Sequence, residues 1–291
     1  MTKNSGIFYA FLSAFFMGTI GVSTKLTIKN FDSFSIVLYV GIVATLILFL
    51  YLLFKKKHTK IISEFKLHPI YYILVGILGM GIQQFTCITS YAFLPASEVV
   101  ILVYTYPLLM LIFARIFFKE KIFFKSIVFI LIGFFGVYLL ITKGSITNFT
   151  FNWGVILALL TSISWGLYSI IIKNKKLDVE IAMFLYLFFG TIFLLFLSPF
   201  FKIDFKFSVD VILGILYIAI IPVTLAFVFW NKALCVTKTS ICSGIILLTP
   251  LISVILNILF LGEKLVLIQL LGFLVILIAL FANFYFQKKE N

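Results

Sequence analysis

The chain has 291 residues, of which 63% are hydrophobic and 11% are charged, and its formal net charge is +13. Soluble domains carry roughly 45–50% apolar and about 25% charged residues, so this composition excludes a water-soluble globular fold. Lipid must be the solvent for most of the apolar surface.

Ten runs without a charged residue follow one another along the chain. Each run has between 16 and 29 residues, and a helix needs about 20 to cross the hydrocarbon core of a bilayer. A charge at the bilayer centre costs about 2.5–3.5 kcal/mol, so long uncharged runs are typical of membrane spans. The sequence lacks the alternating ~10-residue segments of barrel strands. It therefore predicts an all-α integral membrane protein with ten transmembrane helices, at 4–24, 34–54, 69–97, 99–114, 126–142, 144–172, 181–201, 211–231, 239–262 and 265–287.

The basic residues are distributed unequally between the predicted loops. Ten spans place both termini on one side, and if that side is the cytoplasm, 17 of the 23 Lys and Arg residues are cytoplasmic. This excess follows the positive-inside rule. We therefore expect a multi-pass protein of the cytoplasmic (inner) membrane with both termini inside. The net charge then reports orientation, and no nucleic-acid partner is expected.

A sequence pattern in the fourth predicted helix recurs in the ninth. Pro107 is followed thirteen residues later by Glu120, and Pro250 is followed thirteen residues later by Glu263, so the two copies are 143 positions apart. Segment 6–25 likewise matches 154–173. Because its second copy is internal, the first helix is expected to be retained rather than cleaved as a signal peptide.

These matches predict two repeats of five helices, at 1–142 and 153–287. An odd number of spans per repeat makes the second copy enter the membrane from the opposite side. The repeats are then inverted and related by a pseudo-two-fold axis in the membrane plane. That arrangement is typical of secondary transporters that work by alternating access.

Several segments resemble one known family. Segment 224–234 resembles the eighth helix of EamA-type members of the drug/metabolite transporter superfamily, and 240–264 resembles the ninth helix and the turn after it. Segment 269–272 resembles the start of the tenth helix, and the Ser-Trp-Gly element at 164–166 resembles a short motif of the family's sixth helix. At the equivalent place in the first helix, 16–18 lacks the usual Trp. The resemblance implies a ten-helix fold of two EamA-like repeats and a transport activity.

Polar residues inside the predicted spans recur at helical spacing. On the sixth helix Thr161, Trp165, Tyr168 and Ser169 share one stripe. Hydroxyls and amides that faced lipid would be unsatisfied, so such stripes should face the bundle interior. The larger groups predict a substrate cavity, lined by Met17, Gln83, Gln84, Tyr104, Trp165, Tyr168 and Asn257. For Ser and Thr we favour the alternative of interhelical hydrogen bonds, worth about 0.6 kcal/mol each.

Two prolines and one acid are candidates for moving parts. Pro107 and Pro250 lie inside predicted helices, where each should force a kink, and their matched positions favour hinges or gates over static bends. Glu98, at the outer end of the fourth helix, is the candidate for proton coupling. The alternative for Glu98 is a water-exposed partner of the helix dipole.

Other conspicuous residues are assigned structural roles. Glu120 should cap its loop or pair at the surface, and Lys173 should extend toward the membrane surface. Trp230, near the end of a span, should anchor the chain at the membrane interface.

The combined features predict a secondary transporter, in particular an exporter of small organic metabolites such as amino acids or their derivatives. The chain has no GxxxxGK[ST] loop, so ATP is not expected to drive it. It is expected to be a permease rather than an enzyme, with no cofactor or metal. Its partners are the substrate and the lipid bilayer, and its apolar faces would accommodate a homodimer. The alternatives are an integral-membrane enzyme acting on lipid headgroups and a non-transporting lipid-binding or sensor protein. Dispersed acidic residues and the lack of an HExxH motif disfavour the enzyme.

Overall fold

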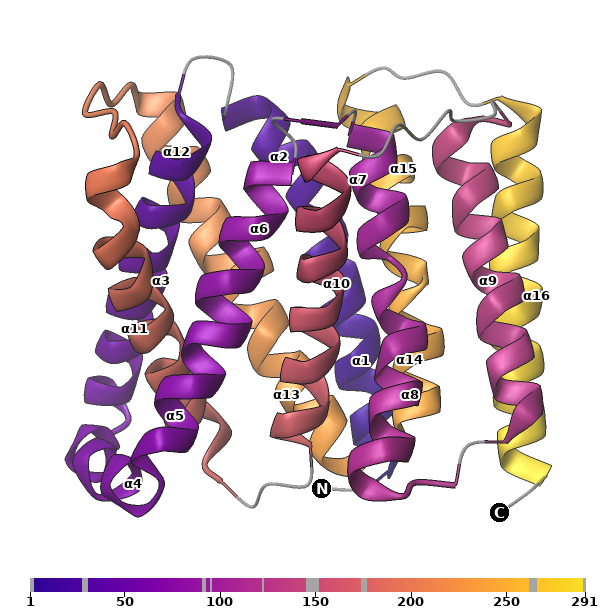
Figure 1. The fold of residues 1–291 in the computed structure, drawn as a ribbon, viewed down its shortest axis with the longest axis horizontal. Helices are drawn as coiled ribbons and strands as arrows, with labels where there is room; N and C mark the ends of the chain where they lie inside the picture. The colour runs from indigo at the N-terminus through magenta and orange to yellow at the C-terminus, as the bar shows by residue number, and fades with distance from the viewer. Residues whose placement is uncertain are drawn as a thin grey trace.

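The computed structural model describes residues 3–27, 31–90, 93–94, 96–121, 123–144, 152–173, 177–261 and 266–289, and the regular secondary structure in these ranges is entirely helical (Figure 1). Seven helical segments there are long and apolar enough to cross a membrane: Phe34–Phe54, Pro69–Cys87, Ile101–Phe118, Trp153–Ile172, Val179–Phe200, Val209–Val236 and Thr239–Phe260. Three shorter apolar helices occupy the places of the first, fifth and tenth predicted spans, at Ser5–Gly18, Phe124–Leu139 and Leu267–Asn283.

The second and seventh predicted spans begin in the same way. They correspond to α3 (Ser33–Phe54) and α11 (Val179–Leu197). The Asp32 carboxylate accepts a hydrogen bond from the Ser35 backbone N–H at 3.0 Å. Asp178, 146 positions later, accepts from the N–H groups of residues 180 and 181 at 3.1 and 3.4 Å. Both carboxylates satisfy N–H groups that have no partner inside the first turn of a helix.

The third and eighth predicted spans each contain a π-helical stretch. The third comprises α5 (Pro69–Gly76), η3 (Ile77–Ile82) and α6 (Gln83–Ser90). The eighth comprises α12 (Val209–Ile218), η5 (Ala219–Leu225) and α13 (Ala226–Val236). A shift of 143 positions moves η3 onto 220–225, inside η5. Only η5 contains a proline, Pro222, so the two sequences reach the same irregularity by different means.

The fourth and ninth predicted spans are each interrupted near the middle. The fourth comprises α7 (Ala96–Val103) and α8 (Tyr106–Phe118), and the ninth comprises α14 (Thr239–Ile246) and α15 (Leu248–Leu261). The breaks fall at Tyr104 and, 143 positions later, at Leu247. Pro107 and Pro250 therefore lie in the first turn of a new helix, where a missing N–H breaks no intrahelical bond. The expectation of prolines inside kinked helices was wrong in this respect.

The remaining helices complete the bundle. They are α1 (Lys3–Gly18), α2 (Ile20–Thr27), η2 (His58–Lys60), α4 (Ile61–Leu67), α9 (Phe124–Thr142), α10 (Trp153–Ile172), η4 (Ser198–Phe200) and α16 (Leu267–Lys289). The ends of the chain that are drawn lie at the same end of the bundle, called the termini end below (Figure 1).

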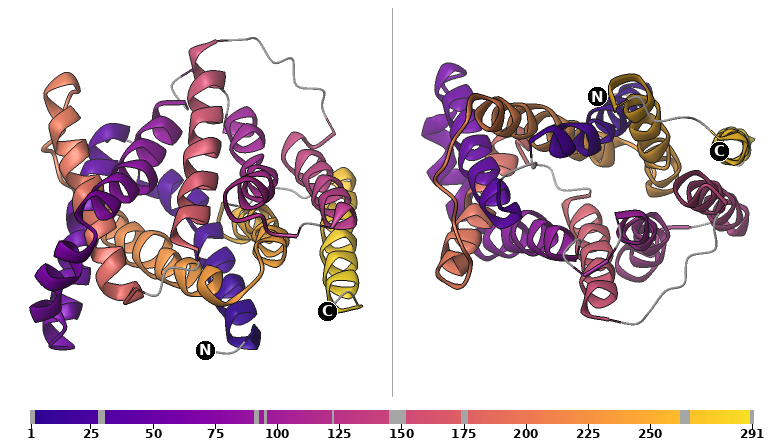
Figure 2. Two further views of the ribbon diagram at one scale, coloured as in Figure 1. Left: turned by 60° about the horizontal axis from the view of Figure 1, so that its bottom comes forward. Right: turned by 90° about the horizontal axis from the view of Figure 1, so that it is seen from above.

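Helices from the two parts of the chain pack in exchanged pairs. Helix α1 packs on α13, while α10 packs on α6; α3 contacts η5, while α11 contacts η3. Helices α9 and α16 lie alongside each other at one edge of the bundle (Figures 1 and 2). The core is therefore built between the two parts of the chain rather than within each.

Glycines allow the closest of these approaches. A Cβ added to Gly79 in η3 would lie 2.1 Å from the ring of Tyr168, and one added to Gly136 in α9 would lie 2.9 Å from the carbonyl oxygen of Gly272. Small residues at such places let helix backbones approach each other in lipid.

Candidate functional site

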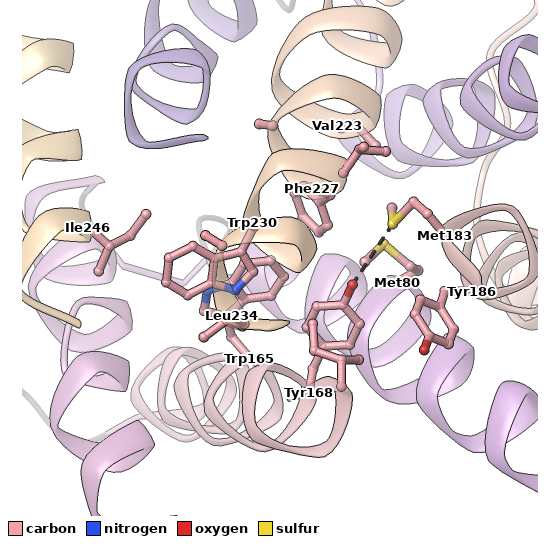
Figure 3. Close-up of a cluster of buried hydrophobic side chains, with 14 of the residues drawn as sticks. Met80, Trp165, Tyr168, Met183, Tyr186, Val223, Phe227, Trp230, Leu234 and Ile246 are labelled. Atoms are coloured by element: carbon pink, nitrogen blue, oxygen red, sulfur yellow. Dashed lines mark hydrogen bonds between the residues drawn. The ribbon is translucent and has the colours of Figure 1, made fainter. Parts of the chain in front are cut away.

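Five residues of α10 and α13 form a cluster in the centre of the bundle, called the aromatic cluster below: Trp165, Tyr168, Phe227, Trp230 and Asn231. All five are buried. The Trp165 ring centroid lies 4.7 Å from that of Phe227 and 5.2 Å from that of Tyr168, and the Trp230 ring stacks on Trp165 at 6.5 Å (Figure 3). In this conformation the rings pack against one another at the place where a substrate cavity was predicted.

The polar atoms of the aromatic cluster bond to one another. Asn231 Nδ2 donates to the Tyr168 hydroxyl at 2.9 Å and to the Phe227 carbonyl oxygen at 2.8 Å. Trp230 Nε1 donates to the Ser169 hydroxyl at 3.0 Å. Trp230 is fully buried, so the expectation that it anchors the chain at the membrane interface was wrong. It lies on the inward face of α13, where Ser169 of α10 satisfies its N–H.

Tyr106 and two predicted site residues, Tyr104 and Met17, lie around this cluster. Tyr106 at the start of α8 meets Trp165 edge-on at 6.2 Å, and Tyr104 stands in the helix break with its ring 5.8 Å from Tyr106. Met17 of α1 packs half-buried against the same hydrophobic core. The predicted residues of the first, fourth and sixth spans thus share one core.

The two predicted glutamines open α6. Gln83 and Gln84 are both half-buried. The Gln83 side-chain oxygen is shielded from solvent and has no hydrogen-bond partner in the part of the chain that the structure describes. A buried acceptor without a partner costs about 1–3 kcal/mol, so a bound ligand with a donor group would relieve that cost.

Two predicted site residues are described only through their helices. Asn257 belongs to α15 and Glu98 to α7, but their side chains lie outside the described residues.

Hydroxyl groups join the helices around the site. Ser164 of α10 donates to the Leu78 carbonyl oxygen in η3 at 2.6 Å, and Ser13 of α1 donates to the Ala226 carbonyl oxygen just after η5 at 2.8 Å. The pairs Thr86–Thr161 and Thr105–Ser162 are each linked at 2.8 Å. π-Helical stretches disturb the regular hydrogen-bond ladder, and here Ser hydroxyls from neighbouring helices bond to carbonyl groups beside them. The expected role of Ser and Thr as interhelical links is confirmed at these positions.

At the termini end, a buried lysine pairs with an acid from a distant part of the sequence. Lys173, directly after α10, is 6% exposed and forms an ion pair with Glu120, which follows α8. The Glu120 carboxylate also accepts from the hydroxyl and the backbone N–H of Thr239, at 2.8 and 3.3 Å. Lys173 thus does not extend to the membrane surface, and the group links three helices. We call Glu120, Lys173 and Thr239 the inner latch.

The inner latch borders a pocket of about 350 Å³, lined by Phe118, Glu120, Lys173, Cys235, Val236, Thr237 and Lys238. Sequence reasoning missed this arrangement, although it noted both Glu120 and Lys173 as members of repeated pairs. The signal that could have found it is the scarcity of charges beside apolar spans, since a Lys buried there needs an acid within reach.

A second charged group lies at the same end. Lys57 Nζ bonds to Asp178 at 2.8 Å and to Glu180 at 2.7 Å, and Lys232 lies 3.7 Å from Glu180. The two hydrogen bonds hold the pKa of Lys57 above its usual 10.5. Partial burial works to raise the pKa of Asp178, but the bonds from Lys57 and from backbone N–H groups outweigh it and keep that pKa below 3.8.

The sequence profile of the EamA-like transporter family matches residues 4–142 and 152–285. The chain belongs to this family. An EamA-like chain with a helical structure of this hydropathy is a multi-pass membrane transporter.

Curated relatives carry the same general description. An "uncharacterized transporter" of Clostridium kluyveri is 26% identical over 303 residues, covering 98% of this chain and 95% of the relative. An "uncharacterized transporter" of Bacillus subtilis is 28% identical over 189 residues, covering 63% of this chain and 61% of the relative. A solved crystal structure matches 99% of both chains with a TM-score of 0.85 at 16% identity, which shows that the fold is shared.

Proposed function

We propose that this EamA-like chain is a secondary transporter that exports small organic metabolites, such as amino acids or their derivatives, across the cytoplasmic membrane. Alternating access would move ten helices as two inverted five-helix repeats, at 1–142 and 153–287. Both termini would lie in the cytoplasm, so that substrate loads from the termini end.

The observation that carries this proposal is the exchanged packing of the two parts around one buried site. The pairs α1–α13 and α10–α6, the two π-helical stretches and the two helix breaks all have a counterpart in the other part. Two inverted units that share one core can open it to either side by equivalent motions.

The aromatic cluster is the proposed substrate site. Its rings would contact the apolar part of a substrate, and the Gln83 oxygen would accept a hydrogen bond from a substrate donor such as an ammonium group. Because Trp165 and Phe227 are in contact, the rings must separate to admit a substrate. The breaks before Pro107 and Pro250 are the proposed hinges for that movement. Proton coupling through Glu98 and assembly as a homodimer remain part of this proposal.

Counterflow in proteoliposomes tests the function. Vesicles loaded with unlabelled amino acids or their derivatives should accumulate the labelled compound for at least one member of the panel. Trp165→Ala should lower that rate at least tenfold while the protein stays monodisperse in detergent. The matched control is Phe196→Ala, since Phe196 is an exposed aromatic residue on the outer face of α11. No counterflow with any compound would overturn the function, and an unchanged rate in Trp165→Ala would overturn the site.

A further inference from the structure

We propose that the pocket at the termini end is a carboxylate-binding site for the substrate, in which Lys173 is the recognising cation and Glu120 is an internal occupant that the substrate displaces. This inference rests on the proposed transport function and names its substrate class as small organic carboxylates, amino acids among them.

The inner latch has the composition of a carboxylate receptor. Three donors converge on the Glu120 carboxylate: Lys173 Nζ, the Thr239 hydroxyl at 2.8 Å and the Thr239 N–H at 3.3 Å. Thr239 opens α14, so its N–H lies at the positive end of a helix dipole. The Lys173 side chain is only 7% exposed. A cation so deeply buried is retained only with an opposite charge beside it.

Glu120 lies at a place where the carboxylate of a small molecule can also reach Lys173. Glu120 lies beyond the end of α8 and, together with Lys173, borders the pocket of about 350 Å³. Ligand sites for small molecules begin at about 300 Å³. Lys238 also lines the pocket, so its lining carries two cations and one acid and favours an anion.

An unsatisfied group in the same lining also points to a ligand. The Thr237 hydroxyl is buried and has no hydrogen-bond partner among the described residues. Thr237 itself is 5% exposed. A bound polar molecule in the pocket would place a donor or acceptor close to this residue.

Exchange of the two carboxylates would couple binding to opening. Glu120 joins the end of α8, in the first repeat, to α10 and α14, in the second. A substrate carboxylate that replaced Glu120 on Lys173 would release the end of α8 from α10 and α14, while the buried Lys173 kept an opposite charge beside it. Binding would thus release the termini end at the moment when substrate occupies it.

The test compares amino acids with their C-terminal amides as probes on the purified full-length protein in detergent. The amino acids that support counterflow should raise the thermal midpoint, and their amides should bind at least tenfold more weakly. Glu120→Gln removes the internal competitor, so it should tighten the apparent Kd for the amino acid several-fold. A gain of affinity cannot arise from misfolding, which keeps the test valid if Lys173 variants are unstable. Lys173→Met should abolish the preference for acid over amide.

The matched control is Lys202→Gln, because Lys202 is exposed and lies 3.9 Å from Asp204 near the opposite end. This variant should keep the wild-type Kd and preference. Equal binding of acids and amides, or an unchanged or weaker Kd in Glu120→Gln, would overturn the carboxylate site even if counterflow persists. The loss of all counterflow in the wild type would instead overturn the proposed function.

Discussion

At the scale of single residues, the buried polar groups divide into those with partners and those without. Asn231, Trp230 and the interhelical Ser and Thr residues bond within the protein, whereas the Gln83 oxygen bonds to none of the described residues. Structural linkers lose stability when they are replaced. A group kept for a ligand should behave in the opposite way.

We therefore predict that Gln83→Leu separates stability from transport. The substitution removes a buried acceptor without a partner, so the thermal midpoint should stay equal or rise. Counterflow should fall at least tenfold because the substrate loses its acceptor. Ser164→Ala is the contrasting variant, since Ser164 bonds to Leu78 and its loss should lower the midpoint. A less stable Gln83→Leu protein with full transport would refute the assignment.

Gly79 should be the glycine whose replacement disturbs the site most directly. A Cβ at Gly79 would meet the ring of Tyr168 at 2.1 Å, and Tyr168 is fully buried and bonded to Asn231. Overpacking of this kind costs about 1–3 kcal/mol. Gly79→Ala should lower both the thermal midpoint and the counterflow rate. Gly166→Ala is the control, because its nearest neighbour would lie at 3.3 Å and the midpoint should change less.

At the scale of elements, the interrupted helices carry the expected motion. A proline in the first turn of a helix breaks no hydrogen bond. Pro107→Ala and Pro250→Ala should therefore leave the free energy of unfolding within about 1 kcal/mol of the wild type. Alanine can continue a helix through the break, so both variants should lose a hinge and show slower counterflow. Pro69→Ala is the control, since Pro69 also opens a helix, α5, but is exposed beside the loop. Full transport in both hinge variants would contradict the role of the breaks.

The Lys57 network predicts a defined pH dependence. The pKa of Asp178 is lowered in the folded protein. The stabilisation by Asp178 is therefore present above pH 3.8 and is lost as the pH falls through the folded-state pKa of this carboxyl group. The pKa of Lys57 is raised in the folded protein. The stabilisation by Lys57 is therefore present below pH 10.5 and is lost as the pH rises through the folded-state pKa of this ammonium group.

The difference in thermal midpoint between wild type and Lys57→Met should thus be constant between pH 5 and about 10 and shrink outside that range. Partly exposed pairs contribute about 0.2–1 kcal/mol each, so the difference will be small. Lys60→Met, on the exposed η2, should show no such difference. A difference that changes steadily between pH 5 and 9 would contradict this network as its source.

At the scale of the whole molecule, the orientation in the membrane can be tested without a substrate. The exposed Lys56 lies at the termini end, and the exposed Lys206 lies in the loop between η4 and α12. In a variant without native cysteines, Lys206→Cys should react with an impermeant maleimide in intact cells. Lys56→Cys should react only after the cells are opened. The reverse pattern would place the termini outside and reverse the proposed direction of loading.

Local sequence features were enough to predict the membrane class, the approximate positions of the helices and the family. Hydropathy acts over about 20 consecutive residues, so an uncharged run marks a span whatever its neighbours are. The repeat at 143 positions was likewise visible in Pro107 and Pro250 alone. The family match at 4–142 and 152–285 confirms the predicted family.

The polar stripe of the sixth span was enough to predict its buried face, but tertiary structure alone decided that Trp230 is buried and which charges meet. In a bilayer both the lipid-facing and the buried face of a helix are apolar, so periodicity did not reveal that Trp230 is in the core. The pairing of Lys173 with Glu120 joins residues 53 positions apart that follow the ends of two different helices. Spans follow from local hydropathy, whereas the site and its latch depend on how helices from both parts of the chain pack together.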